Sequence, residues 1–302
     1  MKVCVLGAGA IGAYYGGLLA RAGNDVVLYA RGDNLAAINS RGLEIRTSEG
    51  SSVVQIAATN DVAELGAPDF AILGVKSYSL AAIAPVVKLI AETGATIVPF
   101  LNGVETTDRL AQLGASADAI VGGVTRISVA RVAPGIVERR GAFQSVIVGE
   151  LDGRVSERVS RIAAAFRDAG VDARASDQIV MELWKKFVFI ASMAAACGLA
   201  RSPIGPVREI AYGRRLLERA VREVVDVASA RGIALAQDEV AQVVGAIDGL
   251  PPGTKPSFLL DVEAGGQTEL DVLSGAVSRY GEAAHVSTPV HDTATAVFSV
   301  KR

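Results

Sequence analysis

A glycine-rich turn near the N-terminus constrains the fold of this chain more than any other feature. Lys2–Leu6 has the apolar composition of a short buried strand, and Ala10–Ala22 has the composition of a helix. In such a strand–turn–helix unit, the glycines of a GxGxxG pattern permit the tight turn, the approach of a pyrophosphate and the packing of helix on strand. The free N–H groups of the helix then bind the phosphates. We therefore predict a Rossmann-type dinucleotide site, with a ligand-free turn as the alternative, formed by Gly7, Gly9, Ala10, Ile11 and Gly12.

The end of the second strand indicates which dinucleotide binds. Asp25–Ala30 has no carboxylate in its last positions, and Arg31 follows it directly. An NAD site places Asp or Glu here to bind the ribose 2′-hydroxyl, whereas an arginine accommodates a 2′-phosphate. We predict NADPH, with Arg31 on its 2′-phosphate. The nearby Asp33 leaves NAD open, and a solvated Arg31 at a helix start is the alternative.

Alternating strands and helices continue through the first third of the chain. Asp69–Val75 and Thr96–Leu101 are further apolar strands, each followed by a helical stretch, Ser79–Ala91 and Glu105–Leu113. This order predicts βαβ units and a parallel sheet. Lys76 and Asn102 follow the two strands, and residues at the carboxyl ends of parallel strands face the ligand. The alternatives are a solvated loop lysine and a plain Asn-Gly turn.

The pattern changes in the middle of the chain. Two Val-, Ile- and Thr-rich stretches, 119–132 and 136–150, flank Pro134–Gly135 and predict antiparallel strands that finish the sheet. A helix over 155–168 and a strand over 171–175 come next, and from Ser176 the chain is helical, with helices predicted over 177–200, 206–231, 237–247 and 268–280. We predict an α/β fold with an N-terminal Rossmann NADP-binding domain, residues 1–175, and a C-terminal all-helical domain, residues 176–302.

Composition excludes several classes of protein. Half of the residues are apolar and the formal net charge is −2, which argues against a disordered chain and against a nucleic-acid binder. Two cysteines, Cys4 and Cys197, form no disulfide framework or zinc motif, and two histidines form no metal site, so we expect a cytoplasmic protein without a metal. The apolar stretch Phe187–Ala200 is shorter than the roughly 20 residues of a membrane span, and we expect a buried helix.

Seven motifs, taken in order, resemble those of one family. The glycine turn is followed by Tyr29-Ala30-Arg31, Val75-Lys76-Ser77 and Leu101-Asn102-Gly103-Val104-Glu105, and the helical part adds Leu183–Phe187, Lys255–Asp261 and Gln267–Asp271. Together they resemble the ketopantoate reductase (2-dehydropantoate 2-reductase) family along nearly the whole chain. The resemblance implies an NADP-dependent oxidoreductase acting on CH–OH, which reduces a 2-oxo acid, by default 2-dehydropantoate in pantothenate biosynthesis. The segments 255–261 and 267–271 do not resemble the related β-hydroxyacid dehydrogenases.

The resemblance also implies roles for single residues. Lys186 is the proton donor to the carbonyl oxygen, Glu269 shapes the active site and Ser257 binds the substrate carboxylate. Lys76 and Asn102 hold cofactor and substrate near the nicotinamide. The alternatives are a surface lysine at 186 beside Lys185, a helix cap at Ser257 and an exposed helix-start carboxylate at Glu269.

The chemistry of the residues agrees with a lysine donor. Hydride transfer to a ketone leaves negative charge on oxygen, so a proton must be delivered there. His285 and His291 lie away from the other motifs and are expected to be ordinary helix residues. A lysine can act as the donor when desolvation makes its ammonium release a proton more readily. Lys186 lies in an otherwise apolar helix, which favours this effect. Glu182, one turn earlier, would stabilise the ammonium if it paired with Lys186, and so would oppose it.

The helix that carries Lys186 departs from the family. Well-studied members have asparagines four and eight residues after the lysine, where this chain has Ile190 and Ala194. These positions share one helix face, so we predict an apolar substrate pocket that discriminates a hydroxyl poorly. Three hypotheses remain: a 2-dehydropantoate reductase, a reductase of a more apolar 2-oxo acid, and a non-catalytic NADPH-binding sensor or partner protein. The sequence leaves the oligomeric state open, with a homodimer as one arrangement.

Overall fold

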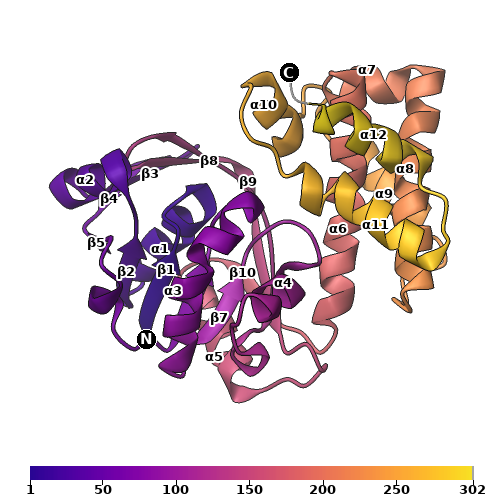
Figure 1. Cartoon of the computed structure of the whole chain (residues 1–302). Coiled ribbons are helices and arrows are strands. Elements are labelled where there is room, and N and C mark those ends of the chain that lie inside the picture. Colours follow the sequence, from indigo (N-terminus) through magenta and orange to yellow (C-terminus); the bar gives the residue numbers. More distant parts are fainter. Residues whose placement is uncertain (301–302) are drawn as a thin grey trace. The chain divides into compact units, whose positions relative to one another are not determined.

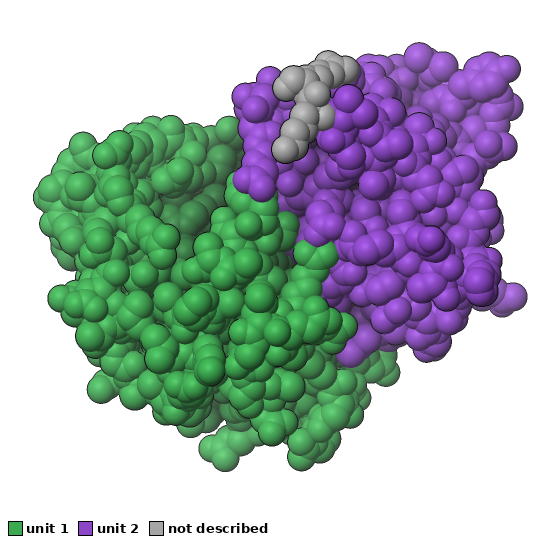
Figure 2. All heavy atoms as spheres, viewed as in Figure 1, with its two compact units in different colours: residues 1–101, 106–179 green, residues 102–105, 180–302 purple. Residues whose placement is uncertain are grey.

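The chain forms two compact units in a computed structural model that describes residues 1–300, apart from the side chain of Ala142 (Figures 1 and 2). Unit 1 comprises Met1–Leu101 and Thr106–Ile179, and unit 2 comprises Asn102–Glu105 and Val180–Arg302. The predicted α/β fold, with a parallel Rossmann-type sheet followed by a helical region, is confirmed. The division after Ile179 replaces the expected one after Ala175, and the transfer of 102–105 to unit 2 was not expected.

The first sheet of unit 1 is parallel throughout, in the order β5-β2-β1-β6-β7. Its strands are short and apolar, with residues of β1 and β6 almost fully buried, as expected where helices cover both faces of a sheet. The strands are β1 (Lys2–Leu6), β2 (Asp25–Tyr29), β5 (Ala57–Thr59), β6 (Phe70–Leu73) and β7 (Thr96–Pro99). The helices that follow strands of this sheet are α1 (Ala10–Arg21), α2 (Gly32–Arg41), α3 (Leu80–Glu92) and α4 (Thr106–Gln112).

A second sheet in unit 1 contains the predicted hairpin. Its order is β10-β9-β3-β4, and β8 pairs antiparallel with β9 around Pro134–Gly135. The prediction of an antiparallel pair is confirmed, but the prediction that this pair finishes the first sheet is wrong. The strands are β3 (Leu43–Thr47), β4 (Gly50–Val54), β8 (Gly122–Ala133), β9 (Ile136–Gly149) and β10 (Asp172–Ala175).

The reason for this difference lies in β3, β4 and α1. The sequence of β3 alternates apolar and polar residues, a pattern typical of a half-buried strand, and β3 pairs with both β4 and β9. Helix α1 contacts β1 and β2 of the first sheet and β3, β8 and β9 of the second. Two buried tyrosines of α1 bond to the second sheet: the hydroxyls of Tyr15 and Thr125 are 2.5 Å apart, and the Tyr14 hydroxyl donates to Gln144 at 2.7 Å.

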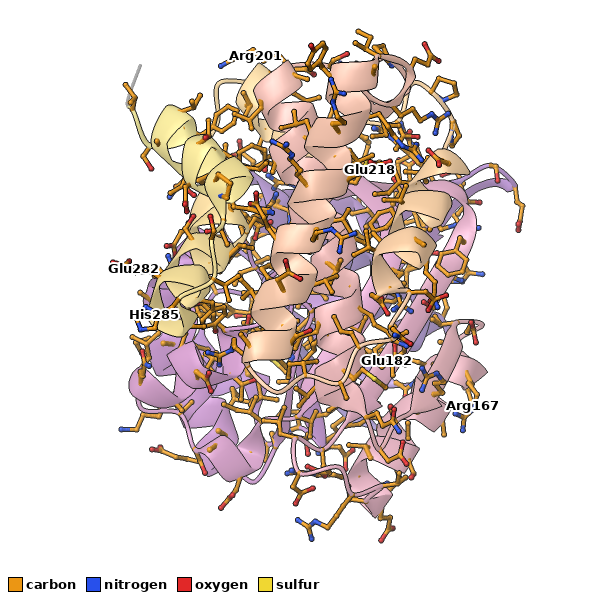
Figure 3. All side chains as sticks on the ribbon, turned by 90° about the vertical axis from the view of Figure 1, so that its right-hand side faces the viewer. Arg167, Glu182, Arg201, Glu218, Glu282 and His285 are labelled. Atoms are coloured by element: carbon orange, nitrogen blue, oxygen red, sulfur yellow. The ribbon has the colours of Figure 1, made fainter. Side chains whose placement is uncertain are left out.

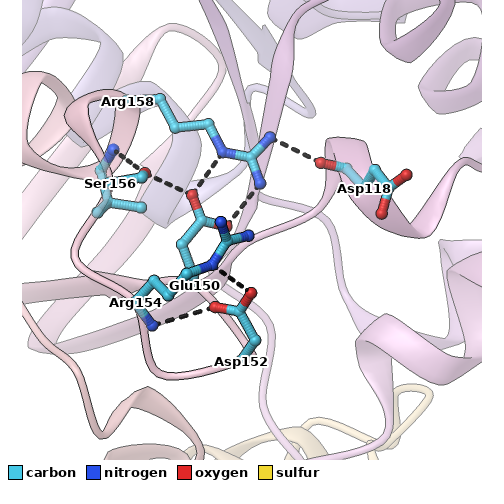
Figure 4. A network of polar contacts seen from close by, with 7 residues as sticks. Asp118, Glu150, Asp152, Arg154, Ser156 and Arg158 are labelled. Atoms are coloured by element: carbon cyan, nitrogen blue, oxygen red, sulfur yellow. Dashed lines mark hydrogen bonds and ion pairs between the residues drawn. The ribbon is translucent and has the colours of Figure 1, made fainter.

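A buried carboxylate fixes the connection from β9 to α5 (Glu157–Asp168). Glu150 accepts two hydrogen bonds from Arg158, at 2.7 and 2.6 Å, and one from the Ser156 hydroxyl at 2.5 Å (Figure 4). Arg158 also donates to the backbone oxygen of Asp118 at 2.7 Å. The bonds from Arg158 lower the pKa of Glu150 against the opposing effect of burial.

Unit 2 is helical in its described part. Its core is built around α6 (Ile179–Ala200), and the helix expected over 206–231 is interrupted at Ile210. The other helices are α7 (Ile204–Glu209), α8 (Ala211–Ala230), α9 (Glu239–Asp248), α10 (Ser257–Glu263), the short η4 (Leu270–Val272), α11 (Ser274–Ala284) and α12 (Pro289–Ser299). By length and composition α6 could cross a membrane, but 61% of that stretch is buried within the protein, which is typical of a core helix.

Candidate active site

The glycine turn of unit 1 can be formed only by glycine at two of its positions. Gly7 has φ +103°, and a Cβ there would lie 2.5 Å from Val75 Cγ1. A Cβ on Gly12 would lie 2.2 Å from the Gly7 carbonyl oxygen. The turn follows β1, which has β2 on one side and β6 on the other, so it lies at the switch point of the sheet, where such folds bind ligands.

The start of α1 fits the pyrophosphate of a dinucleotide. Gly9 is the N-cap and has no side chain to bond the first N–H groups of the helix. These groups therefore keep their capacity to bind an anion, and the helix dipole favours negative charge at the same place. The predicted cofactor residues Ala10 and Ile11 form the first turn of this helix.

Arg31 lies just after β2, where the predicted contact with the 2′-phosphate requires a cation. It follows β2 and Ala30, acts as the N-cap of α2 and has an exposed side chain. Its Nη2 is 3.4 Å from the Tyr29 hydroxyl, and its Cζ is 5.5 Å from the centre of the Tyr29 ring. These contacts are weak, so the guanidinium retains donors for a ligand.

Lys76 lies at the same edge of the sheet. It follows β6 and precedes the short 3₁₀ helix η2 (Ser77–Ser79), and its side chain is half-buried. Because β2, β1 and β6 are adjacent and parallel, the structure brings Arg31, the glycine turn and Lys76 to the carboxyl ends of three neighbouring strands.

One residue that supports the glycine turn was not expected from the sequence. Asn34 is buried, and its Nδ2 donates to the Ala8 carbonyl at 2.8 Å while its Oδ1 accepts from Gly135 N–H at 2.8 Å. It therefore joins the glycine turn to the β8–β9 turn. The available signal was its spacing, since Asn34 lies three and four residues before the apolar Ala37 and Ile38 on the buried face of α2.

Unit 2 brings together two predicted residues from distant motifs. The Asn102 Nδ2 donates to Glu269 Oε2 at 2.9 Å, across a separation of 167 residues. Glu269 is only 4% exposed, so the alternative of an exposed helix-start carboxylate is wrong. A hydrogen bond to a buried charged group is among the stronger ones, and it fixes the orientation of the Asn102 amide.

Helix α6 positions the predicted proton donor. Trp184 and Phe187 are buried and pack edge to face, with ring centres 5.5 Å apart, so they fix the rotation of the helix. Lys185 and Lys186 are both half-buried, and Glu182, which is labelled in Figure 3, precedes Lys186 by one turn. Burial therefore does not by itself distinguish the two lysines, and the role of Lys186 stays a prediction.

The apolar positions beyond Lys186 differ in exposure. Ile190 is half-buried and contacts the core of unit 2, whereas Ala194 is 2% exposed. Ile190 thus presents more side-chain surface than Ala194. Their part in a substrate pocket stays a prediction.

Ser257 lies exposed at the start of α10, and its part in substrate binding stays a prediction. It is the first residue of α10 and is exposed, while the next residues, Phe258 and Leu259, are buried and anchor the helix. The N-cap is Pro256, so the alternative in which Ser257 caps the helix is wrong.

The two histidines have structural positions in the helices of unit 2. His291 is fully enclosed, with Nδ1 3.2 Å from the Ser274 hydroxyl and Nε2 3.1 Å from the Ala220 carbonyl, and burial lowers its pKa to about 4. It thus links α8, α11 and α12. His285 ends α11 in a left-handed conformation.

Comparison with known proteins agrees with this arrangement. Residues 3–153 match the family described as "Ketopantoate reductase PanE/ApbA", and residues 178–302 match its C-terminal domain. The chain is 29% identical to the uncharacterized oxidoreductase YkpB of Bacillus subtilis (97% of this chain, 96% of the relative) and 28% identical to the 2-dehydropantoate 2-reductase of Pyrococcus abyssi (96% and 94%). The crystal structure of 2-dehydropantoate 2-reductase from Geobacter metallireducens superposes with a TM-score of 0.90 at 28% identity, covering 99% of each chain. This protein therefore belongs to the ketopantoate reductase family, whose members are NADPH-dependent oxidoreductases acting on CH–OH groups.

Proposed function

We propose that this protein reduces a 2-oxo acid to the 2-hydroxy acid with NADPH, and that its default substrate is 2-dehydropantoate, in cytoplasmic pantothenate biosynthesis. The hydrogen bond from Asn102 to Glu269 carries the proposal, because it joins two family motifs that are 167 residues apart. The two free, buried cysteines fit a reducing compartment.

Different residues of unit 1 bind different parts of the cofactor. The N–H groups at the start of α1 bind the pyrophosphate, and Arg31 binds the 2′-phosphate with its fork of donors. Bound NADPH supplies the hydride. Lys76, at the end of β6, adds a cation at the same edge of the sheet.

The residues of unit 2 orient the substrate and handle the proton. Lys186 delivers a proton to the carbonyl oxygen, and the Ser257 hydroxyl donates to the carboxylate. Glu269 accepts from the Asn102 amide nitrogen, which fixes the Asn102 carbonyl oxygen as an acceptor for a ligand. In such a site, most of the rate acceleration comes from groups that are already in position before the substrate binds.

A more apolar 2-oxo acid is the second candidate substrate. Ile190 and Ala194 replace amides of the family on one helix face, and a hydroxyl placed against an apolar side chain without a partner costs about 1–3 kcal/mol. Sequence identity does not choose between the candidates, because the chain is as similar to an uncharacterized oxidoreductase as to a 2-dehydropantoate 2-reductase.

The test is NADPH oxidation by the purified protein with a panel of 2-oxo acids. The panel pairs 2-dehydropantoate with its deoxy analogue and includes straight-chain and branched alkyl 2-oxo acids. A tenfold or greater preference for 2-dehydropantoate supports the default substrate, and the reverse preference supports the apolar candidate. Tight NADPH binding without turnover of any of these acids would instead indicate a non-catalytic sensor or partner protein.

The variant Ile190→Asn sharpens the comparison. We expect it to raise kcat/KM for 2-dehydropantoate relative to the deoxy analogue by about one order of magnitude, since an amide can pair the hydroxyl. Ala194→Asn is a poorer probe, because at 2% exposure the new amide would be buried in the core. Unchanged relative activity of Ile190→Asn would remove Ile190 from the pocket.

A further inference from the structure

The segment Asn102–Glu105 is held by unit 2 through each of its residues, although the chain on both sides of it belongs to unit 1. Asn102 donates to Glu269, and Val104 packs against the unit 2 core. Gly103 has φ +89°, and a Cβ there would lie 2.9 Å from the Val272 carbonyl oxygen, so the two backbones are in direct contact. Glu105 completes the series with an ion pair to Arg279.

Arg279, on α11, is the residue that joins this segment to η4. Its Nη2 donates to Glu105 Oε2 at 2.8 Å and to the backbone oxygen of Asp271 at 2.9 Å, and its Nη1 donates to Asp271 Oδ1 at 2.6 Å. The planar guanidinium makes the three bonds at once, which the single ammonium of a lysine cannot reproduce in the same geometry.

We infer that Arg279 is a positioning residue of the active site, which holds Asn102 against Glu269 by clamping the chain next to both. The inference rests on the proposed function, in which Asn102 and Glu269 act on the ligand. One clamp point, Glu105, is three residues after Asn102, and the other, Asp271, is two residues after Glu269. At these separations the backbone leaves little freedom between clamp and hydrogen bond.

The burial of Glu105 explains why the clamp matters. The Glu105 side chain is 11% exposed, whereas Arg279 is 44% exposed. Removing the guanidinium takes an ion-pair partner away from a carboxylate that has little access to water, which is unfavourable. Movement of the 102–105 segment toward water relieves this, and Asn102 moves with it.

Arg214 provides a matched control within unit 2. Its guanidinium also joins two carboxylates, Glu218 at 2.9 Å and Asp248, with Nη2 2.8 Å from Asp248 Oδ2. It lies on α8 with Glu218, whereas Glu282 and His285 mark the end of α11, which carries Arg279 (Figure 3). Arg214→Met therefore removes an equivalent ion-pair pattern without touching the 102–105 segment.

The experiment compares Arg279→Met, Arg279→Lys, Arg214→Met, Asn102→Ala and the double variant Arg279→Met/Asn102→Ala. A misplacement of about 1 Å can cost about 100-fold in rate, so we expect Arg279→Met to lower kcat about 10- to 100-fold, with KM for the 2-oxo acid changed less. Arg279→Lys should recover part of the loss, and the double variant should be no slower than Asn102→Ala alone. Arg214→Met removes pairs whose carboxylates are exposed, so it should lower the melting temperature no more than Arg279→Met does and leave kcat within about twofold of wild type.

Three results would overturn the inference: wild-type kcat in Arg279→Met, an equal loss of kcat in Arg214→Met, or multiplicative losses in the double variant. Hydrogen exchange of the 103–105 amides separates this inference from the proposed function. If the wild-type protein reduces no acid of the panel, the proposed function fails, and the clamp is judged on exchange alone. In that case we expect the 103–105 amides to exchange about tenfold faster in Arg279→Met than in wild type, and at the wild-type rate in Arg214→Met. Equal exchange rates in the two variants would refute the inference.

Discussion

Replacing Arg31 by alanine tests the choice of cofactor without any knowledge of the substrate. Its guanidinium is exposed and has only weak contacts to Tyr29, so its removal should leave the fold intact. A hydrogen bond to a charged group contributes about 1.5–3 kcal/mol, and solvent and salt screen an exposed pair toward the lower end of that range. At about 1.4 kcal/mol per factor of ten, we expect NADPH to bind about 10- to 30-fold more weakly.

The assay titrates the full chain with NADPH and with NADH, following nicotinamide fluorescence at two ionic strengths. The affinity for NADH should stay within about twofold, because NADH has no 2′-phosphate, and the loss for NADPH should shrink as salt rises. Arg41→Ala is the matched control: Arg41 ends the helix that Arg31 begins, and it donates to the Pro134 carbonyl at 3.3 Å. Equal weakening of both cofactors, or the same pattern in Arg41→Ala, would refute the assignment.

Three further changes test other parts of the chain. Lys186→Ala should lower kcat about 10²–10⁴-fold with NADPH binding retained, while Lys185→Ala stays mild, and similar rates for the two would place the donor elsewhere. Glu150→Gln should lower the free energy of unfolding by about 1.5–3 kcal/mol at pH 7. Because the folded-state pKa of Glu150 is lowered, this difference should be present above the unfolded pKa of about 4.3 and vanish as the pH falls through the folded value, which denaturant titrations at several pH values would measure. Gly12→Ala should cost about 1–3 kcal/mol or more, since its Cβ meets the Gly7 carbonyl oxygen, whereas Gly245→Ala, in open space on α9, should be neutral or stabilising in thermal melts.

Local sequence patterns predicted the parallel sheet because its strands and helices are specified by their own residues. The boundaries of β1 were predicted without error, and those of α1 and β2 to within one residue, since a continuous apolar run and a glycine turn each determine local structure. The second sheet was harder to predict. Its β3 and β4 are short and half-exposed, and β3 pairs with β9, a strand far away in the sequence, while α1 contacts both strands. No local window contains these contacts.

The residues of the candidate site also differ in whether local sequence patterns could predict their positions. The cofactor residues of unit 1 lie at strand ends that the pattern already placed side by side, so their proximity could be predicted. Asn34 could not be identified as a support, because its two partners come from turns that are distant in sequence. Glu269 was open to two interpretations until its burial and its bond to Asn102 were known.

Asn102 shows why a motif at a strand end can belong to another folding unit. The apolar run of β7 placed this residue in the Rossmann domain, yet its amide bonds to Glu269 of unit 2, and its neighbours Gly103 and Val104 contact unit 2 as well. Its position therefore depends on the stability of unit 2, and a local opening of η4 or α11 releases Asn102 while the parallel sheet stays folded. It follows that the motif that follows β7 should lose order together with Glu269 and Arg279.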